Sequence, residues 1–210
     1  MPRVDFSLYL VTDRHKTGGR PLVPLLREAL GAGLRVIQLR ERDLGTRPLL
    51  ALAEDSLRAA RAAGAKVLIN DRVDLVMALG ADGVHLRSSS LPVRAARRLL
   101  GPDGLIGVSV HAADEVVEVE AGGADFAVLG PIYETPSKLA YGKPIGVQPI
   151  EEAVRRSRLP VFVIGGITPE RVGDVRRAGA SGVAVIASIL GAESVSSATR
   201  AFLDALRPVR

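Results

Sequence analysis

The chain has 210 residues, of which 47% are hydrophobic and 24% charged, as in a folded globular domain rather than a disordered chain. It contains no cysteine, which excludes disulfides, thiolate metal sites and a cysteine nucleophile. Its net charge of +5 raises the question of nucleic acid, but aromatic residues are only 3% and tryptophan is absent. A base-stacking surface is therefore not expected, and we expect no nucleic-acid partner.

The sequence gives no sign of a membrane or secretory segment. No apolar run approaches the ~20 residues that a membrane-spanning helix needs. The first residues, Met1 to Phe6, lack the apolar core of a signal peptide. We therefore expect a cytoplasmic protein with no membrane partner.

Short β-branched runs alternate with helical patterns along the whole chain. Two of the clearest helical stretches cover residues 49–63 and 169–178. Eight strand-then-helix units predict an α/β protein, a single-domain (β/α)8 barrel over residues 1–210. An open doubly wound sheet is the alternative, but it gives no reason for eight units. The predicted strands are Leu8–Val11, Val36–Leu39, Val67–Asn70, Gly83–Leu86, Leu105–Val110, Phe126–Leu129, Val161–Ile164 and Val183–Ile186.

Polar residues stand where several predicted strands end. In (β/α)8 barrels the active site lies at the carboxyl ends of the strands. Alternation places Gln38 and Arg40 on the same side of the second strand, facing the barrel mouth. These strand ends supply the candidate ligand-binding residues Gln38, Arg40, Arg42, Asn70 and Ser109.

The connection from Gly130 to Pro149 is unusually long and rich in Gly, Pro, Lys and Tyr. Long loops in compact domains are commonly binding loops or lids. Lys138, together with Arg40, would supply positive charge for a phosphorylated ligand, and Thr135 and Ser137 would act as neutral donors.

The last two predicted strands end in small residues and pass into helices. Gly165 and Gly166 follow one strand, and Ile186 and Ala187 follow the next. Phosphate sites of (β/α)8 barrels are built after strands 7 and 8, from backbone N–H groups at such turns. We predict that phosphate binds the N–H groups of Gly166, Ile186 and Ala187. The alternative, that the glycines only make tight turns, explains one such unit better than two in succession.

Motifs at successive strands resemble those of the thiamine phosphate synthase/TenI superfamily, in order and over essentially the whole chain. The resemblance implies a (β/α)8 fold and a phosphorylated thiazole ligand. The segments that carry it are Leu8–Asp13, Gln38–Arg42, Ile69–Asp74, Gly83–Leu86, Gly107–His111, Gly130–Lys138, Val163–Ile167 and Gly182–Ile186.

Members of this superfamily differ in chemistry. The synthase joins a pyrimidine diphosphate to thiazole phosphate, with Mg2+ held by two aspartates. Asp71 matches the first, but Ser90 replaces the second, and Arg42 and Glu134 resemble the TenI version. Because Mg2+ prefers anionic oxygen ligands, the resemblance favours a TenI-like thiazole tautomerase without a cofactor. Asp71 would then hold Mg2+ only if the chain were a synthase.

The tautomerase interpretation needs an acid–base group, because Pro131 stands where the TenI tautomerase has its histidine. The catalytic candidates are His111, Glu134 and Lys138, and His111 is favoured because imidazole titrates near neutral pH. His85 fits a satisfied core histidine better, and His111 could instead cap the following helix. Two other functions stay open: a thiamine phosphate synthase, and a non-catalytic phosphate-binding regulator. The resemblance also suggests a homo-oligomer.

Overall fold

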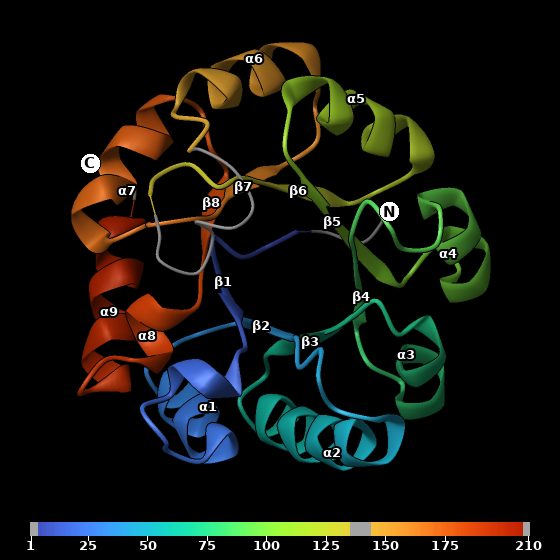
Figure 1. Cartoon of the computed structure of the whole chain (residues 1–210), viewed down its shortest axis with the longest axis vertical. Coiled ribbons are helices and arrows are strands. Elements are labelled where there is room, and N and C mark those ends of the chain that lie inside the picture. The colour runs from blue at the N-terminus through green and yellow to red at the C-terminus, as the bar shows by residue number, and fades with distance from the viewer. Residues whose placement is uncertain (1–3, 135–143, 208–210) are drawn as a thin grey trace.

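The computed structural model describes residues 4–134 and 144–207. Eight parallel strands follow one another around a closed barrel, and β8 pairs with β1, which excludes the open-sheet alternative. Figure 1 shows the helices as an outer ring around these strands. The strands are β1 (Leu8–Val11), β2 (Val36–Leu39), β3 (Lys66–Asn70), β4 (Gly83–Leu86), β5 (Leu105–Val110), β6 (Phe126–Leu129), β7 (Val161–Val163) and β8 (Gly182–Val185).

Helices follow the strands around the barrel. A short 3-10 helix, η1 (Arg14–Lys16), comes directly after β1, and β8 is followed by a four-residue helix and then a longer one. The α-helices are α1 (Leu22–Gly31), α2 (Thr46–Ala62), α3 (Val73–Leu79), α4 (Val93–Leu100), α5 (Ala113–Gly122), α6 (Gln148–Arg156), α7 (Pro169–Arg177), α8 (Ala187–Leu190) and α9 (Val195–Ala205). No helix in the described part of the chain is both long and apolar enough to cross a membrane.

The strands are buried on both faces, which is why their sequences are nearly continuous apolar runs. One cluster lies between strands and helices, and a smaller one fills the barrel interior around Tyr9, Phe126 and Phe162. Two predicted strands end one residue too late, because Ile164 and Ile186 lie beyond the last residues of β7 and β8. Both isoleucines instead enter the turns that carry the predicted phosphate site.

Candidate active site

A cavity of about 70 Å³ lies at the carboxyl ends of β2, β3, β5 and β6. This end of the barrel is where enzymes of this fold place their active sites. The structure brings six predicted site residues together here; they are Gln38, Arg40, Arg42, Asn70, Ser109 and His111. His85 of β4 also lines this cavity, and Tyr9 of β1, for which the sequence indicated no role, is fully buried.

A second cavity, of about 100 Å³, lies between the turns after β7 and β8. It is lined by the predicted Gly165, Gly166, Ile186 and Ala187, and also by Lys16 of η1 and by Asp13, whose carboxylate accepts from the His15 N–H. Ile164 and Ile186 line both this cavity and the mouth, so the two adjoin. Lys16 was not predicted, because nothing in the sequence brings the end of β1 beside the end of β8 until the barrel closes.

The two glycines after β7 also have a packing role. Gly165 and Gly166 have φ of 103° and 61°, where side chains other than glycine are strained. A Cβ on Gly165 would lie 2.7 Å from the Cα of Pro131, and one on Gly166 would lie 2.6 Å from the carbonyl oxygen of Glu134. The turn after β7 therefore packs directly on the loop after β6, and the tight-turn alternative is part of the explanation.

A third cavity, of about 310 Å³, lies beside the mouth and is lined by Arg42, Asp71, Arg72 and Arg87. Arg87 Nη2 donates to Asp71 Oδ2 at 2.5 Å. Partial burial raises the pKa of Asp71, but the hydrogen bonds and charges of Ser90, Arg87 and Arg42 outweigh burial and lower it. Asp71 is therefore an anion among arginines, of which Arg87 was not predicted as a site residue.

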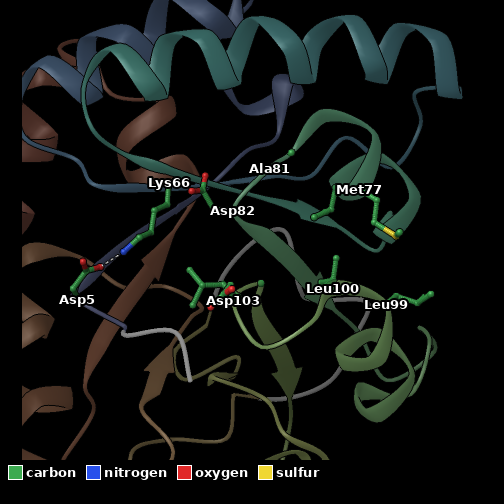
Figure 2. Close-up of a pocket in the computed structure, with 12 residues that line it drawn as sticks. Asp5, Lys66, Met77, Ala81, Asp82, Leu99, Leu100 and Asp103 are labelled. Carbon is green, nitrogen blue, oxygen red and sulfur yellow. Dashed lines mark hydrogen bonds and ion pairs between the residues drawn. The ribbon is translucent and has the colours of Figure 1, made fainter.

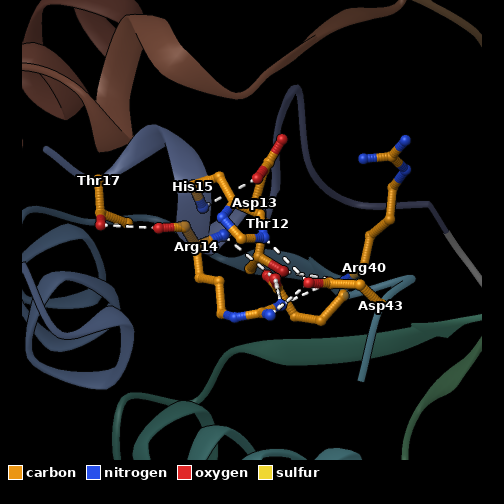
Figure 3. A network of polar contacts seen from close by, with 8 residues as sticks. Thr12, Asp13, Arg14, His15, Thr17, Arg40 and Asp43 are labelled. Atoms are coloured by element: carbon orange, nitrogen blue, oxygen red, sulfur yellow. Dashed lines mark hydrogen bonds and ion pairs between the residues drawn. The ribbon is translucent and has the colours of Figure 1, made fainter. Parts of the chain in front are cut away.

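A polar network holds the end of β1 against the end of β2 (Figure 3). The backbone N–H of Arg14 donates to Glu41 Oε2 at 3.1 Å, and the Arg14 guanidinium also pairs with Asp43. Thr12 Oγ1 accepts a hydrogen bond of 2.9 Å from the backbone N–H of Arg40. Arg14 and then His15 hold the pKa of Asp43 well below its usual range. These bonds fix the backbone that carries Arg40 into the mouth.

His111 lies at the rim of the mouth. Its Nδ1 donates to the carbonyl of Gly130 at 2.7 Å, and its backbone N–H donates to Glu115 at 2.9 Å. The cap residue of α5 is Ala112, so His111 precedes the helix rather than capping it. Glu134 is exposed in the loop after β6, whereas the predicted Thr135, Ser137 and Lys138 lie outside the described residues.

The largest cavity among those described, about 610 Å³, lies at the opposite end of the barrel. Figure 2 shows it between Lys66, Asp82 and Asp103 on one side and Met77 and Leu99 on the other. Its residues stand where β3, β4 and β5 begin, the face that serves stability in this fold. The volume of a cavity alone therefore does not identify the candidate active site.

The fold and these cavities together define a (β/α)8 barrel with a candidate ligand site at the carboxyl ends of its strands. Comparison with known proteins is more specific. The chain belongs to the thiamine monophosphate synthase (TMP-TENI) family, whose model matches residues 8–189.

Close relatives of the chain cover nearly its full length. It is 47% identical to a putative thiamine-phosphate synthase of Geobacter sulfurreducens, over 99% of this chain and 98% of that protein. It is 40% identical to the thiamine-phosphate synthase of Moorella thermoacetica, over 100% of this chain and 99% of that one. The structure of thiamine phosphate pyrophosphorylase from Pyrococcus furiosus superposes with a TM-score of 0.86, at 32% identity over 95% of each chain.

The expectation of a TenI-like thiazole tautomerase is wrong, because these relatives are named as synthases. Ser90, Arg42 and Glu134 resemble the TenI version, but none of the three excludes synthase chemistry. Mg2+ is commonly held by one or two carboxylates together with substrate phosphates, so Ser90 in place of a second aspartate does not exclude a metal-dependent synthase. A synthase needs no tautomerase base, so Pro131 in place of the TenI histidine is no longer a difficulty.

Proposed function

We propose that the chain is a thiamine phosphate synthase, which joins a hydroxymethylpyrimidine diphosphate to a thiazole phosphate. The observation that supports this most is the row of three adjoining cavities at one end of the barrel. A small-residue cradle beside Lys16 suits a monophosphate, and the mouth suits a polar ring. The arginine-lined cavity beside the mouth suits a diphosphate.

The reaction needs charge stabilisation more than acid–base chemistry. A bond forms between the thiazole ring nitrogen and the pyrimidine methylene carbon, while the bond from that carbon to the diphosphate oxygen breaks. Negative charge therefore grows on the leaving diphosphate. Arg42 lines both the mouth and the adjoining cavity, and Arg40 lines the mouth, so both guanidinium groups would stabilise that charge. Gln38, Asn70 and Ser109 would bind and orient the ring, and His111 would bind at the rim.

Mg2+ fits this site when the diphosphate supplies most of its ligands. The described residues contain no cluster of three or more His, Cys, Asp or Glu side chains that could hold a metal ion. Asp71 offers one carboxylate in the arginine-lined cavity, and one carboxylate with substrate phosphates is a usual Mg2+ arrangement. When bound, the ion would add positive charge at the leaving diphosphate.

The proposed function is tested with the purified chain, both substrates and Mg2+. We expect thiamine phosphate and inorganic diphosphate to form in equal amounts, and the rate to fall when the metal is chelated. Absence of product with both substrates present would contradict the proposal.

We also propose, as expected from the sequence, that the protein is cytoplasmic and forms a homo-oligomer.

The phosphate cradle yields a separate prediction for Gly166→Ala. The added Cβ would meet the Glu134 carbonyl oxygen at 2.6 Å, in a backbone with φ of 61°. Displacing this turn should cost one charge-assisted hydrogen bond to the phosphate, so KM for thiazole phosphate should rise by about 10-fold or more. Steady-state kinetics with each substrate varied in turn measure this effect.

Gly173→Ala is the matched control, because Gly173 lies within α7 and its added Cβ would meet only Arg177 Nη1, at 3.5 Å. Alanine inside a helix is favourable, so KM should not change. Equal KM values for both variants and the unaltered chain would reject the cradle as the phosphate site.

A further inference from the structure

Four polar side chains form a continuous hydrogen-bonded row from the barrel interior into the mouth. Gln38 Nε2 donates to the Tyr9 hydroxyl at 3.2 Å, and that hydroxyl contacts His85 Nδ1 at 3.3 Å. His85 Nε2 contacts Ser109 Oγ at 2.9 Å. Tyr9, Gln38 and His85 are at most 3% exposed, whereas Ser109 is only partly buried and reaches the mouth. These hydrogen bonds thus link Tyr9 in the barrel interior to the candidate site.

The donor and acceptor roles of these four side chains follow from the bond between Gln38 and Tyr9. Because the Tyr9 oxygen accepts from Gln38, its own hydrogen is directed to its other partner, His85 Nδ1. Nδ1 is then an acceptor, so a neutral imidazole carries its hydrogen on Nε2 and donates it to Ser109 Oγ. Ser109 accepts from His85, and its own hydrogen remains available to a ligand in the mouth.

The protonation states of the two central groups are stable. Burial, and next the charge of Arg40, lower the pKa of His85 to about 3, so the imidazole is neutral at physiological pH. Burial raises the pKa of Tyr9 well above its ordinary value, despite the hydrogen bond from Gln38, so the phenol keeps its proton.

The packing of β5 leaves room for the imidazole. Gly107 lies within β5, where glycine weakens a strand unless another group needs its space. A Cβ there would lie 2.8 Å from His85 Nδ1 and 2.4 Å from Phe126 Cζ. The Phe126 ring lies 6.1 Å from the His85 ring and 5.4 Å from the Tyr9 ring, centroid to centroid. The absent side chain of Gly107 therefore makes the slot that holds His85.

We infer that Tyr9 and His85 are positioning residues that keep Ser109 as a hydrogen-bond donor to the substrate ring. The inference rests on the proposed function for the identity of that ring. An all-apolar interior would avoid the cost of burying a phenol, an amide and an imidazole, so a role in packing alone does not explain them. If these hydrogen bonds ran in the opposite direction, Ser109 would donate to His85 and offer the substrate a lone pair instead.

The first test is the tautomer of His85, read by 15N NMR on histidine-labelled protein. The chain has three histidines, and the His85 signals are assigned by their loss in His85→Gln. We expect hydrogen on Nε2 alone, unchanged across the neutral pH range. Hydrogen on Nδ1 would overturn the inference. This reading needs no substrate, so it stands even if the proposed synthase activity fails.

The second test compares Tyr9→Phe with Phe162→Leu. Tyr9→Phe removes only the hydroxyl, so the His85 tautomer should become mixed and kcat/KM should fall about 10-fold, as for loss of one oriented hydrogen bond. Phe162→Leu weakens the packing of the interior rings, 6.4 Å from the Tyr9 ring, without removing a polar atom. It should keep the Nε2 tautomer and nearly unchanged kinetics, even where its stability falls.

A double variant separates positioning from stability. If Tyr9 acts through Ser109, adding Tyr9→Phe to Ser109→Ala should cause little further loss of kcat/KM. Independent, multiplied losses would overturn the inference, and so would full activity of Tyr9→Phe alone.

Discussion

Replacing Asp71 by Asn should slow thiamine phosphate formation by about 10²–10³-fold, the range seen when one charge-stabilising group is removed from an active site. The change removes the carboxylate that pairs with Arg87 in the arginine-lined cavity. The Mg2+ concentration for half-maximal rate should also rise by more than about 10-fold, because an amide is a weaker ligand than a carboxylate. Rates measured over a range of Mg2+ concentrations test both effects.

Asparagine is the appropriate substitution here because Asp71 has φ of 65°. Asn tolerates this left-handed conformation, whereas alanine would add backbone strain to the loss of charge. Asp74→Asn is the matched control, because Asp74 lies three residues after Asp71, its side chain is 63% exposed and it pairs with Arg72. The Asp74→Asn variant should keep its activity. If Asp71→Asn also kept its activity and its Mg2+ dependence, the assignment of Asp71 as a magnesium ligand would be refuted.

The second large effect is on stability and concerns Arg97 of α4. Arg97 Nη2 donates to Asp125 Oδ2 at 2.6 Å, and Arg97 Nη1 donates to the Gly104 carbonyl at 2.6 Å. The Asp125 side chain is only 1% exposed. Arg97→Met leaves this buried carboxylate without its cation, so the free energy of unfolding should fall by about 3–5 kcal/mol. Urea unfolding at neutral pH measures the difference.

The pH dependence of this destabilisation has a definite sign. Burial raises the pKa of Asp125, although the Ile106 N–H and Arg97 oppose the shift. Without Arg97 the folded-state pKa rises further above the unfolded value of about 3.9, so the folded state binds the extra proton. The stability lost in Arg97→Met should therefore shrink as pH falls from about 7 toward about 4.

The control for that experiment is Arg58→Met, which breaks an ion pair with Asp55 on the surface of α2. The two side chains are 73% and 55% exposed, so the loss should be below about 1 kcal/mol. A loss in Arg97→Met as small as in Arg58→Met would show that the buried pair adds nothing. A loss that stays constant with pH would show that Asp125 does not take up the proton.

The repeated pattern in the sequence determined the fold. Eight apolar strand runs separated by helical stretches predicted a (β/α)8 barrel, and five of the strands have the predicted limits. This worked because strands covered on both faces leave continuous apolar runs that a single sequence displays. The resemblance of motifs at successive strand ends also identified the superfamily, which the match over residues 8–189 confirms. The branch was wrong, because Ser90, Arg42 and Glu134 resemble the TenI version while the relatives are named as synthases, and a diphosphate-bound ion does not require a second aspartate.

Contacts across the barrel could be found only in the tertiary structure. Lys16 and Gly166 line one cavity, although 150 residues separate their positions in the numbering. Arg87 meets Asp71 because neighbouring strands end side by side, and no periodicity records which side chains then touch. Tyr9 and His85 look like ordinary members of apolar strands, and their hydrogen bonds become visible only when the barrel closes. Local pattern determined which segments are strands, whereas closure decided which polar groups share the interior, because those pairings join residues distant in the chain.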